Sequence, residues 1–377
     1  MNPKEISLPK IRVAPSEPLE SQSALLVNAA PDGWQFLRVL RAAKQERASL
    51  AMGSPLFARL NETVKNWKKT PDGENELAFV LIAAIEDPED TGNVIPWLLD
   101  AGLSPNAPHE LDGEEDGKLA YPLATAVEWS MDEAAEALMG HGAVIGDQTI
   151  KAAVFQCHCR ERAAMGKKTA DEQRIAAVFR AEKIALALLE RHPGVDVWAQ
   201  DDAIGPSIMH WACCLPHDRM LRALCSLPQG DLRGANAQPF LAGLLSMAVT
   251  EASGTKTLET LMELASLRQE DLDQAVVLAV ANNKTAWLYR LLEKGATSHL
   301  AKKWAKGESN DDRLAGMVPY AWTHDKDTVS RGFESLAAWE ESHSLARDVK
   351  AVEQATQPEK ASAADCEKSA LTKRRRI

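Results

Sequence analysis

Aromatic residues are scarce in this chain, and phenylalanine, tryptophan and tyrosine together make up 5% of its 377 residues. Runs of valine and isoleucine are also few, whereas alanine and leucine are frequent. Unbranched side chains lose little rotamer freedom in a helix, so this balance favours helices over strands. We therefore predict an all-α chain.

Long apolar segments and disulfide patterns are also missing. No stretch approaches the roughly 18 apolar residues of a membrane-spanning helix, and the first residues contain no apolar segment of a secretory signal. The cysteines, at positions 157, 159, 213, 214, 225 and 366, do not have the spacing of a small disulfide-bonded scaffold. We therefore expect a cytoplasmic protein without membrane insertion.

Excess positive charge is absent as well, because the formal net charge is −11. Nucleic-acid binding relies on lysine and arginine that neutralise phosphates, so this balance disfavours a nucleic-acid partner. An acidic chain instead favours a basic surface on a partner protein.

Both ends of the chain are polar and lack hydrophobic periodicity, so residues 1–25 and 346–377 are predicted to be disordered. The C-terminal segment ends in the basic cluster Lys373, Arg374, Arg375 and Arg376. Such a cluster is typical of a nuclear import signal or of a contact for an acidic surface.

Between the ends, short predicted helices alternate with breaks, and two sequence elements recur. One opens a helix, at residues 121–127, 207–213 and 274–280, and contains a small residue at Ala126, Ala212 and Ala279. The other is leucine-rich and closes a helix, at residues 98–107, 133–145, 188–201 and 291–297. Glycine follows the leucines at positions 102, 142 and 295, where it would end the helix in a left-handed conformation.

These elements resemble ankyrin repeats, most closely at residues 121–145, and at 207–213 through Met209, His210, Ala212 and Cys213. The resemblance implies a helical-repeat solenoid over residues 71–300, with helical caps at 26–70 and 301–345. An acidic loop at 110–118 and a charged insertion at 155–181 depart from the repeat period.

The resemblance also implies protein binding through the concave face of the array. It places on this face Glu128 and Trp129 from one repeat, Trp211, Cys214 and Leu215 from a later one, and Ala281 and Asn282 from the last. Trp129 lies outside the stripe of core residues, so it suits an interface anchor, although packing against a neighbouring repeat would explain it equally well.

The cysteines and histidines are the strongest candidates for a site of chemistry in this sequence. Adjacent side chains on a helix diverge by about 100°, so Cys213 and Cys214 are poorly placed to share a metal ion. We expect His210 to be structural, with its ring bonded to the backbone of a neighbouring turn. Cys214 and His217 lack a third orienting group, so the sequence predicts no metal, no cofactor and no catalytic residue.

The sequence thus favours a protein-binding adaptor or inhibitor, or a bacterial effector delivered into a host cell, where the basic tail would act. Two alternatives remain open. One is an enzyme with an unrecognised Cys/His site within residues 155–225, which includes Cys157, His158 and Cys159. The other is a structural helical-repeat subunit of a complex.

Overall fold

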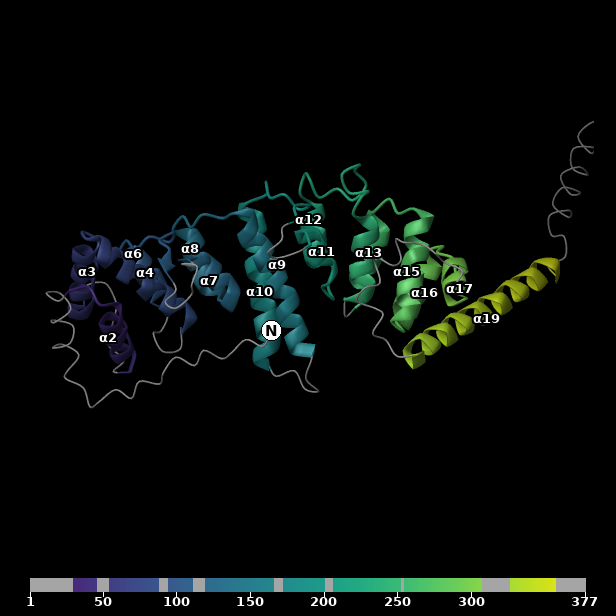
Figure 1. The fold of residues 1–377 in the computed structure, drawn as a ribbon, viewed down its shortest axis with the longest axis horizontal. Helices are drawn as coiled ribbons and strands as arrows, with labels where there is room; N and C mark the ends of the chain where they lie inside the picture. The colour runs from purple at the N-terminus through teal and green to yellow at the C-terminus, as the bar shows by residue number, and fades with distance from the viewer. Residues whose placement is uncertain are drawn as a thin grey trace, which may run out of the picture. The chain divides into compact units, whose positions relative to one another are not determined.

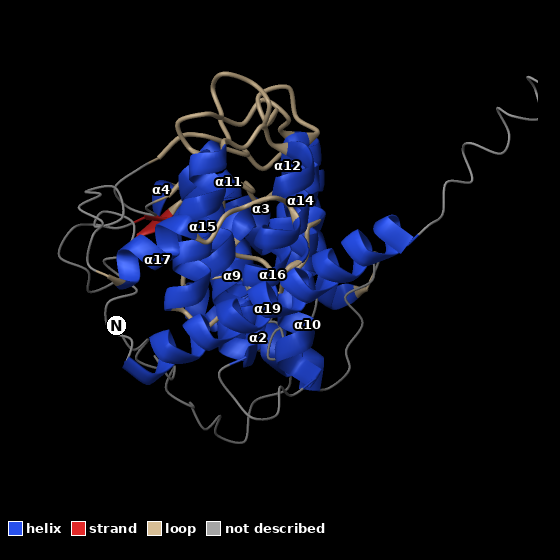
Figure 2. Ribbon diagram, turned by 90° about the vertical axis from the view of Figure 1, so that its right-hand side faces the viewer, coloured by secondary structure: helices blue, strands red, loops and turns tan. Residues whose placement is uncertain are grey.

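The computed structural model describes residues 30–45, 54–87, 94–110, 119–165, 172–200, 206–251, 254–306 and 326–356. Within these ranges the regular structure is helical, except for β1 (His109–Glu110) and β2 (Leu119–Ala120), which pair antiparallel (Figure 2). The predicted all-α class is therefore confirmed. The predicted N-terminal segment 1–25 and the basic residues 373–376 lie outside the described ranges.

The chain forms two compact units, which comprise residues 1–212 with 219–230, and residues 213–218 with 231–377. The described helices of the first unit are α2 (Gly33–Gln45), α3 (Pro55–Trp67), α4 (Pro71–Glu86), α6 (Ile95–Asp100), α7 (Pro122–Trp129), α8 (Asp132–Gly140), α9 (Asp147–Met165), α10 (Glu172–Arg191), α11 (Ile208–Cys213) and α12 (Arg219–Cys225). The last residue of α11 is counted with the second unit.

Figure 1 shows helices α4 to α10 following one another along the first unit, and their contacts divide them alternately between two rows. Helices α4, α7 and α9 contact one another in turn and form the first row, while α6, α8 and α10 form the second. Each first-row helix also packs against the second-row helix that follows it. Leu98, Leu138 and Leu188 of the second row are fully buried, as is Ala126 of the first, so the core lies between the rows.

Capping residues fix where the early helices begin. The Thr70 hydroxyl accepts a hydrogen bond of 3.2 Å from the backbone N–H of Gly73, and Pro71 occupies the first helical position of α4. A Cβ at Gly73 would collide with the carbonyl group of Trp67, so α3 and α4 can be joined this tightly only by a glycine.

The predicted glycine turns are present at the ends of second-row helices. Gly102 and Gly142 have φ angles of 94° and 86°, in the left-handed region. After each glycine, the next backbone N–H donates to a buried leucine carbonyl, from Leu103 to Leu98 (3.1 Å) and from Ala143 to Leu138 (3.0 Å). Both bonds satisfy carbonyl groups that the helix end would leave without a partner.

Turns of the same geometry occur in the second unit. Ala296 N–H donates to Leu291 (3.1 Å) after Gly295, whose φ is 100°. The turn that joins the two helices of the repeat also matches, because Ser130 and Asn283 both have positive φ, at 57° and 50°.

The charged insertion predicted at 155–181 falls within a pair of long helices that pack against each other. These helices, α9 and α10, contain 19 and 20 residues, against 8 and 9 for α7 and α8. Residues 166–171, between the two helices, lie outside the described ranges.

The second unit contains α13 (Leu241–Thr250), α14 (Lys256–Leu264), α15 (Gln269–Ala281), α16 (Thr285–Glu293), α17 (His299–Ala305) and α19 (Lys326–Thr356). Helix α15 is central, because it contacts α13, α16, α17 and α19. Helix α19 continues to Thr356, past the boundary that the sequence suggested at residue 345. The difference follows from the alanine, arginine, lysine, glutamate and glutamine residues beyond that boundary, which favour a helix even where few large apolar side chains occur.

Candidate functional site

The turn between α7 and α8 is held by two arginines from the pair of long helices. Arg160 of α9 donates to the carbonyl oxygen of Glu128 (2.6 Å) and to the Ser130 hydroxyl (3.2 Å). Arg180 of α10 donates to the carbonyl oxygen of Ser130 (3.3 Å). Since Ser130 is fully buried and left-handed, the helix end that precedes it is held in one position.

Trp129 is the last residue of this helix end, and 47% of its surface is exposed. Glu128, beside it, is also exposed. The core of the repeat is filled by Leu123, Ala126 and Val127, all nearly or fully buried. A large aromatic side chain is thus presented on a rigid support without being required for the core.

Exposed and half-buried residues form a stripe on each of two neighbouring first-row helices. On α7 they are Tyr121, at its N-cap, Ala124 and Glu128, and on α4 they are Phe79, Ala83 and Glu86. Spacings of three and four residues place each set on one side of its helix, opposite the core. We call these six residues the α4–α7 face.

Aromatic groups lie at one end of the α4–α7 face. Tyr121 is 48% exposed, and the ring of Phe79 lies between Trp34 and His109, with centroid distances of 4.9 and 5.2 Å. The middle is lined by the small side chains of Ala83 and Ala124. The face therefore combines an aromatic end with a middle of small side chains, where the backbone of another chain would meet little bulk.

Two carboxylates mark the opposite end. Burial raises the pKa of Glu86, and repulsion from the nearby Glu128 raises it further. Among the described residues, neither the Glu86 nor the Glu128 carboxylate forms an ion pair. Arg160 donates to the backbone carbonyl oxygen of Glu128 and not to its carboxylate. Sequence reasoning identified Glu128 but missed Glu86, Tyr121 and Ala124, for which the only signal was their spacing along a helix.

The predicted binding residues of the later repeats do not form such a surface. Cys214, Leu215 and Ala281 are exposed by only 1%, 6% and 3%. Their assignment to a binding face is therefore wrong for the chain in this conformation, because they pack in the core. Asn282 is half-buried and caps its own helix by donating to the Leu278 carbonyl (2.8 Å).

In the second unit, Ala281 is buried because helix α19 packs against α15. Gly332 of α19 lies so close to the carbonyl group of Val280 that no Cβ fits between them. Helix α15 is therefore covered on the side that the ankyrin resemblance would leave open, and its residues from Gln274 to Ala281 are all buried.

Trp211 and the neighbouring histidine and cysteines serve packing. The Trp211 ring is half-buried against Phe155 (4.7 Å between centroids) and His158 (5.3 Å). Burial raises the pKa of the Cys157 thiol far above its usual range and also raises the pKa of Cys159. A raised thiol pKa disfavours the thiolate that nucleophilic chemistry or metal binding needs. In the described ranges, no three His, Cys, Asp or Glu side chains are grouped to hold a metal ion.

The ring of His210 contacts a neighbouring side chain at the start of its own helix. Its Nδ1 lies 2.8 Å from the Ser207 hydroxyl, and both residues are buried. Burial lowers the pKa of His210 to about 4, so the ring is neutral near pH 7. The pair lies at the start of α11, where it holds the helix end rather than facing solvent.

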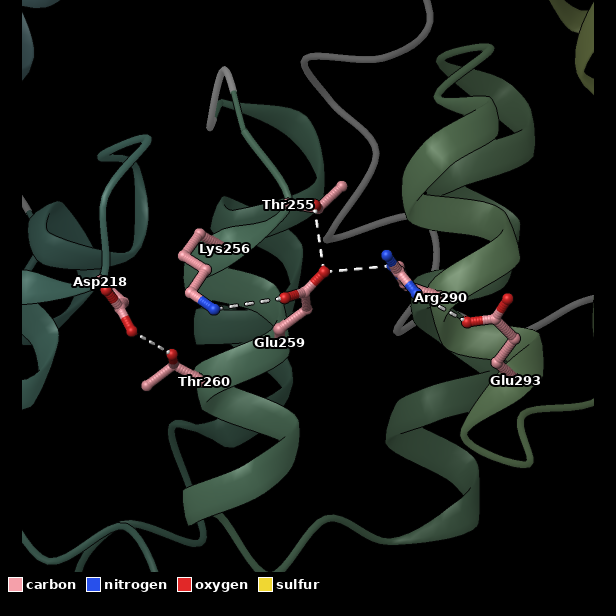
Figure 3. A network of polar contacts seen from close by, with 7 residues as sticks. All are labelled: Asp218, Thr255, Lys256, Glu259, Thr260, Arg290 and Glu293. Carbon is pink, nitrogen blue, oxygen red and sulfur yellow. Dashed lines mark hydrogen bonds and ion pairs between the residues drawn. The ribbon is translucent and has the colours of Figure 1, made fainter.

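A groove of about 330 Å³ lies in the second unit, between α14 and α16. Figure 3 shows that its charged side chains bind one another. Arg290 of α16 contacts Glu259 of α14 (3.1 Å) and Glu293 (3.0 Å), while Lys256 lies 3.7 Å from Glu259. The Thr260 hydroxyl donates to Asp218 (2.8 Å). Because the two signs compensate, this network connects neighbouring elements and selects no ligand by charge.

The comparisons with known proteins do not change this description. No protein-family model, no curated protein and no solved structure matches the chain. The ankyrin resemblance therefore stays a prediction that depends on the repeated turns. Among the described helices, none is both long and apolar enough to cross a membrane.

Proposed function

We propose that this chain is a protein-binding module of ankyrin-like helical hairpins, and that it holds its partner on the α4–α7 face with Trp129 as an anchor. The observation that carries the proposal is the exposure of Trp129 beside a face whose helices are already packed on their other side. Exposed aromatics on a rigid support are typical of interface anchors.

The rigidity of the support favours binding over a merely structural role. Arg160 and Arg180 fix the turn that follows Trp129 before any partner arrives. A preordered anchor loses less conformational entropy on binding, so more of its buried area contributes to affinity. The ankyrin-like assignment is supported by the matching turns at Gly142 and Gly295.

Affinity purification with the full chain from its native organism, followed by quantitative mass spectrometry, tests the proposal. The comparison is between the unmodified chain, Trp129→Ala and the control Phe179→Ala, which removes an aromatic that is 60% exposed on α10. We expect a partner that the unmodified chain and the control retain equally and that Trp129→Ala loses. Equal recovery by all three would refute this binding face.

A further inference from the structure

We propose that the partner segment on the α4–α7 face carries an arginine or lysine side chain that inserts between Glu86 and Glu128, with its aliphatic part beside Trp129. This inference rests on the proposed function and adds the chemistry of the partner. It is an inference from charge complementarity on a defined surface.

Two carboxylates lie on neighbouring helices of the α4–α7 face. Glu86 ends α4 and Glu128 is the penultimate residue of α7, and they repel each other. Within the described ranges no cation of this chain pairs with either of them. A cation from outside would relieve the repulsion and gain two attractions at once, which is the usual basis of charge selectivity at an interface.

Among the described residues, the positive groups nearby direct their N–H groups to other oxygens and form no ion pair with these carboxylates. Arg160 uses its guanidinium on the Glu128 carbonyl and the Ser130 hydroxyl, and Arg180 donates to the Ser130 carbonyl. On the α2 side, Arg41 lies 3.8 Å from Asp87, the residue after Glu86. Each cation is thus engaged with another group.

The surroundings fit a basic side chain better than a bare ion. Trp129, which follows Glu128 in the chain, exposes 47% of its surface, and long cationic side chains pack their methylene groups and charge on such rings. Ala83 and Ala124 leave room for the backbone of the segment, and Tyr121 and Phe79 offer apolar contacts further along.

A phage-displayed library of random dodecapeptides, selected on the immobilised full chain, supplies the probe. Selected peptides are synthesised, and their affinities are measured for the unmodified chain and three variants. Glu86→Gln with Glu128→Gln removes both charges. Glu74→Gln with Glu190→Gln removes two charges from exposed carboxylates elsewhere, since Glu74 lies on the opposite side of α4. Ala124→Tyr fills the middle of the face without changing its charge.

We expect the selected peptides to share an arginine or lysine beside an apolar residue. Loss of the Glu86 and Glu128 charges should weaken their binding about tenfold or more, whereas the control pair should leave it unchanged. Replacing the shared basic residue by glutamine in the peptide should weaken binding to the unmodified chain and to the control pair, but not to the variant that lacks both the Glu86 and Glu128 charges.

Two other outcomes would separate the two proposals. Peptides whose binding is lost with Ala124→Tyr but is indifferent to both carboxylates would overturn the inference and leave the binding face intact. Peptides that bind the Ala124→Tyr variant as well as the unmodified chain would refute the binding face itself. Circular dichroism of each variant checks that a lost interaction does not reflect a lost fold.

Discussion

At the scale of single residues, tryptophans in this chain differ in role according to what surrounds them. Trp129 is 47% exposed, whereas Trp97 is 9% exposed and its ring stacks on Phe36 with a centroid distance of 6.4 Å. Exposure of this kind separates a side chain that can bind from one that holds the fold.

Truncating the two tryptophans should therefore have different effects on stability. Trp97→Ala leaves a cavity and should cost on the order of 3–5 kcal/mol of unfolding free energy. Trp129→Ala should change it by well under about 1 kcal/mol, as is usual for surface positions. Urea unfolding of both variants measures the difference. A loss of several kcal/mol in Trp129→Ala would mean that this ring belongs to the core.

His210 should make the stability of the chain depend on pH. Its pKa falls from 6.5 in the unfolded chain to about 4 in the folded one because burial disfavours the charged ring. Between these values the unfolded chain binds more protons, so stability is lost as the pH falls from 6.5 towards 4. The loss contributed by this residue is on the order of 3 kcal/mol.

Unfolding midpoints at pH 7, 6, 5 and 4.5 test this expectation. His210→Gln removes the titrating group and should lower the midpoint at pH 7 by disturbing the contact with Ser207, but its midpoint should then fall less on acidification. Parallel pH profiles for the two proteins would show that the acid sensitivity comes from other groups.

At the scale of elements, two glycines at the end of α8, Gly140 and Gly142, differ in whether the backbone requires a glycine. Gly142 has a φ of 86°, which L side chains rarely adopt, although the space around it is open. Gly140 also has open space but belongs to the helix itself. Gly140 and Gly142 therefore differ in backbone conformation and not in the space available for a side chain.

Alanine at these two positions should therefore act in opposite directions. Gly142→Ala should destabilise the chain by about 1–2 kcal/mol, the cost of a left-handed L residue. Gly140→Ala should leave stability unchanged or raise it by up to about 1 kcal/mol, because alanine favours the helix. Thermal unfolding of the two variants is the measurement. Equal effects would show that the turn does not need its left-handed residue.

At the scale of the whole molecule, the second unit depends on its terminal helix to cover α15. The buried residues of α15 include Val276, Val277 and Val280, and α19 crosses this helix at Gly332. Helical arrays generally need an end element that shields the apolar side of their last repeat.

Ending the chain after residue 306 should therefore expose α15, lower the melting temperature and increase binding of a hydrophobic dye. Gly332→Ala tests the same contact more gently, since the added methyl group would collide with the Val280 carbonyl and should cost about 1–3 kcal/mol. Ser330→Ala, at an exposed position of α19, is the control. An unchanged melting temperature in the shortened chain would show that α15 needs no cover.

The sequence by itself determined the local features of this protein. Alanine and leucine content predicted the all-α class, and Gly102, Gly142 and Gly295 marked helix ends correctly, because glycine's freedom at positive φ is a property of the residue alone. The stripe of core residues in α7 likewise left Trp129 outside the core, where the structure finds it half exposed.

Only the tertiary structure decided which of the predicted binding residues are accessible. The ankyrin resemblance aligns Cys214, Leu215 and Ala281 with exposed residues of α7, yet they are buried. In α15 the cause is α19, which lies far along the chain and whose packing no repeat alignment can foresee. The same holds for Glu86, which became part of a site because α4 and α7 lie side by side. Burial and charge coupling depend on neighbours distant in sequence, and the folded chain alone brings them together.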